Sequence, residues 1–219
     1  MDVFDIIGPV MIGPSSSHTA GAARIGLMAR QILGEIPEEA EIRLYGSFAR
    51  TGRGHGTDKA LVGGLLGMQA DDVRIPQSLE IAAALGLHVH IVPDSAPGGH
   101  PNTARISVRG RSGRHIELTG CSIGGGSIVI RRIGRYEVSL TGEYPALIIP
   151  HRDTPGAVAH VTGILAAAGI NIARMRVSRS DRGGEAMMVI ETDQPVEDPA
   201  LRSLRRTDGI IDVMRVERL

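Results

Sequence analysis

Several residue types that support particular functions are scarce in this chain of 219 residues. It contains one cysteine, Cys121, no tryptophan, three tyrosines and two phenylalanines. A single thiol excludes an internal disulfide framework, an all-cysteine zinc site and the thiolate set of an iron-sulfur cluster within one chain. Because the formal net charge is zero and aromatic rings for base stacking are few, we expect no nucleic-acid partner.

Long apolar runs and the pattern of a signal peptide are missing as well. No apolar run reaches the roughly 18 residues of a membrane-spanning helix. The segment Met1 to Ile12 carries two Asp and no Lys or Arg, unlike a signal peptide. We therefore expect a soluble, cytoplasmic protein with no membrane partner. At 42% hydrophobic residues it can bury a core, which must be mainly aliphatic.

Glycine is plentiful but unevenly distributed. Of the 29 glycines, 23 lie in residues 1–144 and 6 in the remaining residues. The change in composition predicts two domains, an α/β domain over residues 1–143 and a smaller domain over residues 144–219.

The second domain has a regular alternation of predicted elements. Asp153 or Thr154 can cap the first helix, and Gly169 ends it. The order βαββαβ is the ferredoxin-like arrangement. The predicted strands are 146–150, 170–180, 186–192 and 210–216, and the predicted helices are 156–168 and 198–206.

This domain resembles the ACT domain, a small-ligand regulatory module, through the run His151-Arg-Asp-Thr-Pro-Gly156 and the later Gly169-Ile-Asn-Ile172. Any other ferredoxin-like domain is the alternative. The resemblance implies an amino-acid site at a domain interface, with His151, Asp153 and Asn171 as allosteric residues. Asp153 stands where phosphoglycerate dehydrogenase has asparagine; its carboxylate can pair with a ligand ammonium or serve only as a helix cap.

The first domain opens with a run of hydroxyl side chains, Ser15, Ser16, Ser17 and Thr19, around His18, before a predicted helix over residues 20–33. Hydroxyls beside the unpaired N–H groups of a helix start bind carboxylate or phosphate well. A capped helix with surplus polar residues is the alternative interpretation, because capping needs only one of them.

A second glycine-rich segment follows a predicted strand over residues 42–48. Its glycines at 52, 54 and 56 predict a flexible loop over residues 49–59 that presents Arg53, His55, Thr57 and Asp58, before a helix over 57–68. The spacing fits neither a phosphate loop nor a dinucleotide fingerprint. Lys59 is the only lysine, which hints that a compact ammonium is needed there.

Residues 70–144 predict further strands and turns, among them a helix over 79–85 and strands over 87–92, 104–109 and 127–133. His88 and His90 share one strand face, which favours a polar sheet face over a metal site. Cys121 falls in a predicted glycine loop over 120–126, either as a small core residue or as a functional thiol.

Four motifs in order resemble the β subunit of iron-sulfur-dependent bacterial L-serine dehydratase. They are Pro14-Ser-Ser-Ser-His-Thr19, Gly46-Ser-Phe-Ala-Arg-Thr-Gly-Arg-Gly-His-Gly-Thr-Asp-Lys59, His100-Pro-Asn-Thr103 and Ser122-Ile-Gly-Gly-Gly126. The resemblance implies an N-terminal α/β domain similar to the allosteric substrate-binding domain of phosphoglycerate dehydrogenase. It also implies a partner α subunit that ligates a [4Fe-4S] cluster, with no metal ligand in this chain.

The family chemistry implied is deamination of L-serine to pyruvate and ammonia: the cluster activates the hydroxyl, and a base removes the Cα proton. His18 and His55 are the candidate acid/base residues. We expect a β–β dimer through the ACT domain. The expected substrate contacts are Ser15, Ser16, Ser17, Thr19, Arg53, Thr57, Asp58, Lys59, His100 and Asn102.

Two other functions remain open from the sequence. One is an amino-acid-sensing regulatory protein with no catalytic activity of its own. The other is a self-contained hydrolase that uses the serine run with His18, although no Gly-x-Ser-x-Gly nucleophile elbow is present.

Overall fold

The computed structural model describes residues 10–96 and 99–219, apart from the side chain of Arg53. The chain forms two compact units, Met1–Gly134 and Arg135–Leu219. The predicted domain boundary at residue 144 lies somewhat later in the chain than this division, and the two domains over residues 1–143 and 144–219 stay a prediction. Within the described residues, every helix falls short of the length and apolar character that crossing a bilayer requires.

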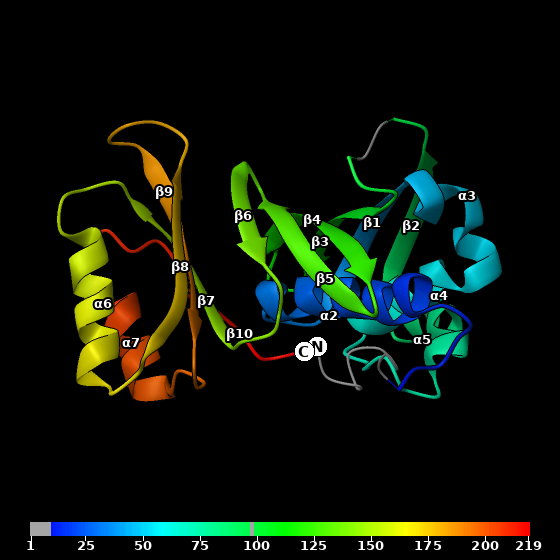
Figure 1. The fold of residues 1–219 in the computed structure, drawn as a ribbon, viewed down its shortest axis with the longest axis horizontal. Coiled ribbons are helices and arrows are strands. Elements are labelled where there is room, and N and C mark those ends of the chain that lie inside the picture. Colours follow the sequence, from blue (N-terminus) through cyan, green and yellow to red (C-terminus); the bar gives the residue numbers. More distant parts are fainter. Residues whose placement is uncertain (1–9, 97–98) are drawn as a thin grey trace. The chain divides into compact units, whose positions relative to one another are not determined.

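The N-terminal unit is built on a sheet with helices against one face (Figure 1). Its strands run in the order β2-β1-β3-β4-β5, with β1 and β2 parallel and the other pairs antiparallel. Its elements are η1 (Ser16–Ala20), α2 (Gly21–Leu33), β1 (Pro37–Tyr45), α3 (Gly46–His55), α4 (Thr57–Leu65), η2 (Ile75–Gln77), α5 (Ser78–Ala84), β2 (His88–Asp94), β3 (Asn102–Gly110), β4 (His115–Gly124) and β5 (Ser127–Ile133).

Two helices, α2 and α4, cross with almost no space between their backbones. A Cβ built on Gly64 would collide with Ala23 O and Leu27 N of α2, and one built on Gly26 would collide with Leu61 O of α4. Only glycine allows this approach. The helix pair then covers the apolar side of the sheet, where alternate residues of β1 such as Ile42 are fully buried.

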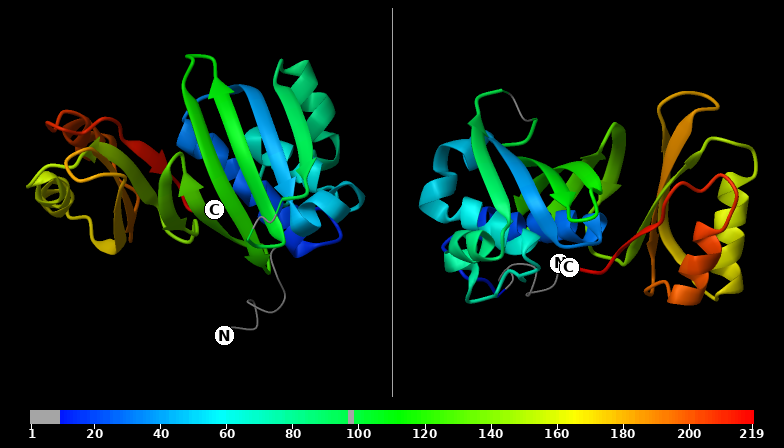
Figure 2. Two further views of the ribbon diagram at one scale, coloured as in Figure 1. Left: turned by 90° about the horizontal axis from the view of Figure 1, so that it is seen from above. Right: turned by 180° about the vertical axis from the view of Figure 1, so that it is seen from behind.

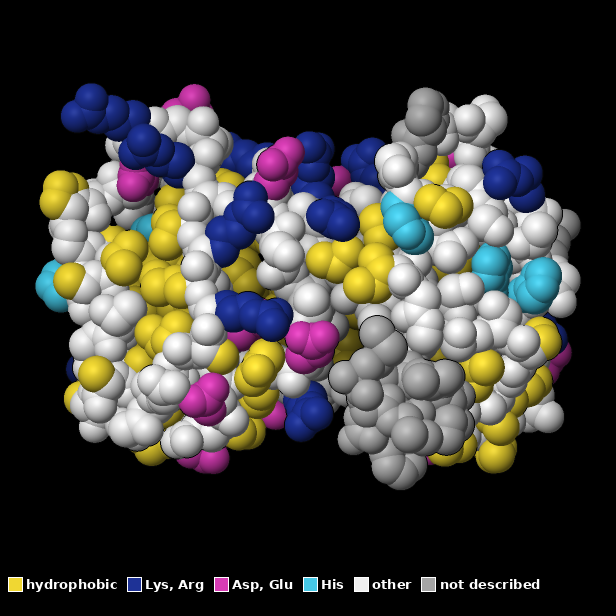
Figure 3. Space-filling view, viewed as in Figure 1, with side chains coloured by type: hydrophobic (Ala, Val, Ile, Leu, Met, Phe, Trp, Pro, Cys, Tyr) yellow, Lys and Arg dark blue, Asp and Glu magenta, His cyan; other side chains and the backbone are white. Residues whose placement is uncertain are grey.

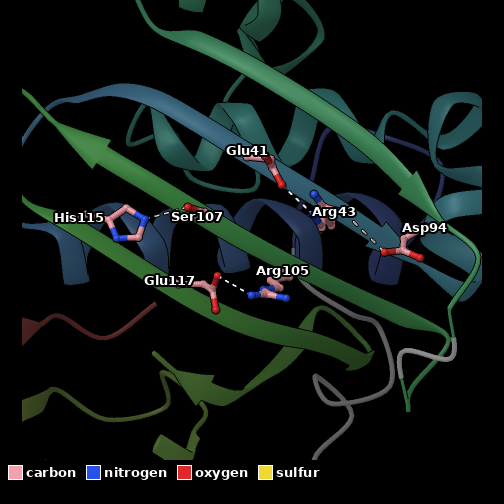
Figure 4. A network of polar contacts seen from close by, with 7 residues as sticks. All are labelled: Glu41, Arg43, Asp94, Arg105, Ser107, His115 and Glu117. Carbon is pink, nitrogen blue, oxygen red and sulfur yellow. Dashed lines mark hydrogen bonds and ion pairs between the residues drawn. The ribbon is translucent and has the colours of Figure 1, made fainter. Parts of the chain in front are cut away.

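The opposite face of this sheet is polar (Figure 4). Arg105 pairs with Glu117 at 2.7 Å across β3 and β4, and Ser107 Oγ lies 2.8 Å from His115 Nε2. Such exposed pairs contribute little to stability. His88 and His90 are exposed on β2, opposite Glu39 and Glu41 of β1. In the described part of the chain, no group of three or more His, Cys, Asp or Glu side chains is placed to hold a metal ion.

The second unit has its own four-stranded sheet in the order β10-β7-β9-β8, with both helices on one face (Figure 2). Leu147, Ile149, Val161, Leu165 and Met188 belong to the core between the layers. The predicted ferredoxin-like βαββαβ order is confirmed. The elements in this order are β7 (Ala146–Arg152), α6 (Ala157–Ala167), β8 (Ile172–Arg179), β9 (Glu185–Thr192), α7 (Asp198–Arg205) and β10 (Met214–Val216), and β6 (Tyr136–Leu140), which precedes them, is not a strand of this sheet.

Two predicted details of this unit are wrong. Gly156, in a left-handed conformation, stands at the N-cap of α6, and no side chain caps the helix. Asp153 instead accepts a hydrogen bond from Gly183 N at 3.1 Å, in the turn between β8 and β9. The last strand is also shorter than predicted: Met214–Val216 form β10, whereas Ile210 forms only an isolated bridge with His151 of β7.

The predicted flexible loop over residues 49–59 is largely helical. Helix α3 begins at Gly46, where the backbone has φ +57°, and Ser47 N and Phe48 N both donate to Pro101 O at 2.6 and 3.3 Å. The Phe48 side chain is fully buried. These tertiary contacts outweigh the cost of about 1 kcal/mol for each interior helix glycine.

Cys121 also differs from its predicted place in a loop. It lies within β4, opposite Val129 of β5, and is 3% exposed. Its Sγ lies 3.3 Å from Thr103 Oγ1. The core interpretation of this residue is therefore the one that the structure supports.

Candidate active site

Helix α3 carries three polar side chains on one face, Ser47, Thr51 and His55, because residues four apart lie one turn above each other. This face meets His18 from η1. His18 Nε2 lies 3.1 Å from Ser47 Oγ and 3.2 Å from Thr51 Oγ1. The helix thus positions two hydroxyls at one nitrogen of the imidazole.

The other ring nitrogen of His18 faces the serine run. Its Nδ1 lies 3.1 Å from Ser17 Oγ and 3.4 Å from Ser15 Oγ. Ser15 caps this first turn, since its Oγ also accepts a hydrogen bond from His18 N at 3.3 Å. Hydroxyls both donate and accept, so either tautomer of the neutral ring is satisfied here.

His55 lies beside His18, with ring centroids 5.0 Å apart. His55 Nδ1 is 3.0 Å from Thr51 O, a carbonyl that only accepts, so Nδ1 carries the proton of the neutral ring and Nε2 is the basic nitrogen. Thr19 Oγ1 donates to His55 O at 3.4 Å. Both His18 and His55 are half-buried, not enclosed. The pair can therefore meet a ligand from outside the chain.

Burial lowers the pKa of His18 below its ordinary value of 6.5, and the charge of His55 lowers that pKa further. The ring is therefore neutral at neutral pH and ready to accept a proton. The folded pKa lies below the unfolded one, so the unfolded chain binds more protons as the pH falls below about 6.5. This histidine thus reduces the free energy of unfolding at acidic pH and not at neutral pH.

We expect His55→Gln to raise the pKa of His18, because it removes the like charge while burial remains. The measurement is NMR titration of the His18 ring in the full chain. His90→Gln, which removes an exposed histidine from β2, should leave that pKa unchanged. An unchanged or lower His18 pKa in His55→Gln would contradict the electrostatic coupling.

Several other residues predicted to contact the substrate show no contact with His18. Ser16 lies in η1 and is half-buried. Thr57 is fully buried at the start of α4, and its hydroxyl has no hydrogen-bond partner. Asp58 lines a separate cavity, and Lys59 O accepts a hydrogen bond from Ser78 Oγ at 2.6 Å. The side chain of Arg53 lies outside the described residues.

The segment His100–Asn102 supports the start of α3. Pro101 O accepts from Ser47 N, and Asn102 forms a bridge with Gly46. His100 lines a cavity of about 620 Å³ together with Arg50 and other residues around β2. The structure therefore brings these predicted residues next to α3, but not into contact with His18.

Sequence reasoning missed Ser47 and Thr51 as functional residues. Both belong to the motif Gly46–Lys59, but a loop over residues 49–59 gives no reason to place their side chains together. The signal was the spacing Ser47, Thr51, His55, which places all three on one side of a helix.

The three allosteric residues predicted in the second unit are not gathered in one place. His151 is buried, with Nδ1 3.1 Å from Ile149 O. Asp153 contacts the turn after β8, and backbone N–H donation from Gly183, aided by Arg179, lowers its pKa. Asn171 donates to Asp193 Oδ2 at 2.6 Å, beyond the other end of β8. Asp153 and Asn171 thus lie at opposite ends of the strand.

The side chains of this chain do not fit an iron-sulfur cluster, which takes several thiolates. Its one cysteine, Cys121, is buried in β4 with Thr103 as its neighbour.

Comparisons with known proteins agree on two regions. A family profile described as "Serine dehydratase beta chain" matches residues 2–91, and one described as "ACT domain" matches residues 147–209.

Curated relatives extend the similarity over nearly the whole chain. "Probable L-serine dehydratase, beta chain" of Bacillus subtilis is 48% identical over 98% of this chain and 97% of its own length. "L-serine dehydratase, beta chain" of Peptoniphilus asaccharolyticus is 36% identical over 88% of this chain and 87% of its own. "D-3-phosphoglycerate dehydrogenase" of Bacillus subtilis is 28% identical over 90% of this chain but 37% of its own length.

Proposed function

This chain belongs to the family of L-serine dehydratase β chains, and from that premise we propose that it supplies one wall of an active site that an α chain completes. The pair converts L-serine to pyruvate and ammonia. The observation that carries the proposal is a neutral imidazole, His18, held between two pairs of hydroxyls beside a second histidine.

The resemblance found in the motifs is confirmed by these relatives. The predicted fold class is confirmed too, by the similarity to phosphoglycerate dehydrogenase and by the ACT match over the second unit.

His18 is the base that we assign to the Cα proton of the substrate. A base must be unprotonated when the substrate binds, and the lowered pKa of His18 meets this requirement at neutral pH. The hydroxyls of Ser47 and Thr51 fix the plane of the His18 ring. The ring is therefore held in one orientation toward the Cα proton that it removes. His55 is the second acid/base candidate, with Nε2 as its basic nitrogen.

The substrate carboxylate is assigned to the serine run. Ser15 and Ser17 hydroxyls lie at His18 Nδ1, and Ser16 follows Ser15 at the start of the same turn. Hydroxyl donors beside the base place the Cα proton near the imidazole once the carboxylate is held. Removal of that proton and departure of the β-hydroxyl as water leave an aminoacrylate, which tautomerises and is hydrolysed to pyruvate and ammonia.

We assign the [4Fe-4S] cluster to the α chain, because this chain lacks the thiolates to hold it. The test is reconstitution of the chain with an iron-sulfur α chain and assay of pyruvate and ammonia from L-serine. We expect no activity from either chain alone and activity from the pair. Activity of this chain alone, or an inactive pair whose α chain holds an intact cluster, would overturn the proposal.

Removal of the hydroxyls at Nε2 should weaken catalysis without abolishing it. We expect Ser47→Ala and Thr51→Val each to lower kcat/KM of the reconstituted enzyme about tenfold, the effect of one lost hydrogen bond of about 1.4 kcal/mol. Thr51→Ser keeps the hydroxyl and should retain most of the activity. A Thr51→Val enzyme as active as the unaltered one would show that the Thr51 hydroxyl does not support His18.

A dimer through the second unit explains why its predicted ligand residues lie apart in one copy. β8 is an edge strand of its sheet, and Val177 on it is 45% exposed. Hydrophobic side chains gather over α6 and β8 (Figure 3). Pairing of two copies along β8 covers this surface. In an antiparallel pair, it also brings Asn171 of one copy toward the Asp153 end of the other.

An amino-acid sensor is the second candidate function, favoured by the ACT match. It predicts serine binding to this chain, measured by calorimetry, together with no lyase activity that depends on an α partner. The reconstitution assay separates the two functions, because only the dehydratase predicts pyruvate from the pair.

A further inference from the structure

A second cavity lies between α3, α4, α5 and the edge strand β2, with a volume of about 500 Å³. We call it the α5 cavity. Its size is within the range of small-ligand sites. Ala49 in its wall lies on the side of α3 away from Ser47 and Thr51, and neither of these two residues lines it. The α5 cavity is therefore separate from the histidine site.

The inner wall of the α5 cavity is apolar. Val89 and Ile91 of β2 pair in register with Ala40 and Ile42 of β1, so all four face the helical side of the sheet. On β1 these side chains are buried, whereas on β2 they are only half-buried. The helical layer thus covers β2 only in part and leaves apolar surface for a ligand to cover.

Two opposite charges line the same cavity. Arg50 comes from α3 and Asp58 from α4. Within the described part of the chain, Arg50 has no ion pair or side-chain hydrogen bond, and the Asp58 carboxylate accepts only Lys59 N, at 2.9 Å. The two charges do not pair with each other, so both are available to a ligand.

We propose that the α5 cavity binds a free α-amino acid with an aliphatic side chain, such as leucine. Its carboxylate pairs with Arg50, its ammonium pairs with Asp58, and its side chain packs against Phe48, Leu79, Val89 and Ile91. An α-amino acid is a compact ligand that carries both charges next to one apolar group. L-serine fits less well, because its hydroxyl would face apolar walls without a partner.

Bound ligand would also act on the histidine site through α3. The Phe48 ring lines the α5 cavity and packs edge-on against His18, with centroids 5.2 Å apart. Ligand that shifts Phe48 therefore changes the surroundings of the His18 ring. The binding proposal stands without the proposed dehydratase function, whereas a regulatory effect on activity rests on it.

The test is calorimetry of the full chain with L-leucine at millimolar concentrations, alongside two fragments of leucine. Isoamylamine keeps the ammonium and the side chain, and 4-methylpentanoate keeps the carboxylate. We expect Arg50→Gln to weaken leucine binding about tenfold or more and to leave isoamylamine unaffected. Asp58→Asn should weaken leucine similarly and leave 4-methylpentanoate unaffected. Arg132→Gln and Asp71→Asn are matched controls that alter exposed charges elsewhere.

Ile91→Phe, which fills the cavity without removing a charge, should abolish leucine binding. Asp153→Ala should leave leucine binding unchanged, because Asp153 lies in the second unit. No heat from L-leucine, or leucine binding that survives both Arg50→Gln and Ile91→Phe, would overturn the proposal. The lyase assay of the reconstituted pair reports separately on the proposed function.

Discussion

We expect the His18→Gln chain, reconstituted with an α chain, to have a kcat/KM for L-serine about 100-fold to 10,000-fold below that of the unaltered chain, the usual effect of losing a general base. Glutamine keeps polar contacts with the surrounding hydroxyls but cannot take up a proton. The effect should fall mainly on kcat, because the residues assigned to the carboxylate remain. Initial rates of pyruvate formation over a range of serine concentrations measure both constants.

His90→Gln is the matched control for this substitution. It changes an exposed histidine of β2 and should leave kcat/KM within about twofold of the unaltered enzyme, as expected for a surface site. Circular dichroism and co-elution with the α chain show whether each variant folds and assembles. A correctly assembled His18→Gln enzyme with near-normal kcat/KM would place the base elsewhere, on His55 or on the α chain.

The pH profile separates a proton acceptor from a residue that only supports the fold. The unaltered enzyme should lose kcat/KM as the pH falls below 6.5 and His18 becomes protonated, at a value lowered by burial and by His55. In His18→Gln the remaining activity should lack this acid limb. A limb that persists unchanged at the same pH would assign it to another group.

Patterns that depend on neighbouring residues were predictable from the sequence. In the second unit, alternating aliphatic residues and turn glycines gave the order of elements, and Gly169 follows α6 with φ +69°. In the first unit, the strand predicted over residues 127–133 is β5, Ser127–Ile133. These elements follow local periodicity, so no knowledge of distant contacts was required.

The organisation of α3 depends on contacts with residues distant in the sequence, and the loop predicted here from local patterns was wrong. Its start is fixed by Pro101 O, which lies more than fifty residues later in the chain. Gly52 sits against Thr57, where a Cβ would be 3.3 Å from the threonine Cβ. A glycine that allows close packing in a helix looks, in the sequence, like a glycine that makes a loop flexible. Because the sequence did not predict this helix, it did not predict the face formed by Ser47, Thr51 and His55 either.

In the sequence, the glycines of the first unit predict loops over residues 49–59 and 120–126. The structure gives several glycines a different role. Gly21 packs against Ser122 of β4, and Gly26 and Gly64 lie at the crossing of α2 with α4. Because α2 follows directly from η1, this crossing also fixes where His18 stands. These glycines therefore help to hold the helix that leads into the histidine site.

Gly64→Ala should consequently lower the free energy of unfolding of the N-terminal unit by about 3 kcal/mol, at the upper end of the usual cost of overpacking. The added methyl group would meet Ala23 O and Leu27 N, which are backbone atoms of α2. Backbone atoms cannot rotate away as a side chain can, so the two helices must separate. Urea denaturation measures the change, and hydrogen exchange of α2 amides identifies the unit that unfolds.

Gly54→Ala tests the same substitution in the same unit where space is open. Gly54 lies in α3, and among the described residues, its chain neighbours and the nearby helix backbone aside, no atom comes within 4 Å of a Cβ built there. Here the higher helix propensity of alanine should raise the free energy of unfolding, by about 0.5 kcal/mol near a helix end. Opposite signs for the two alanines would show that close helix packing, not chain flexibility, requires glycine at position 64. A Gly64→Ala chain as stable as the unaltered one would mean that α2 and α4 can move apart without loss, and that their crossing does not hold η1 and His18 in place.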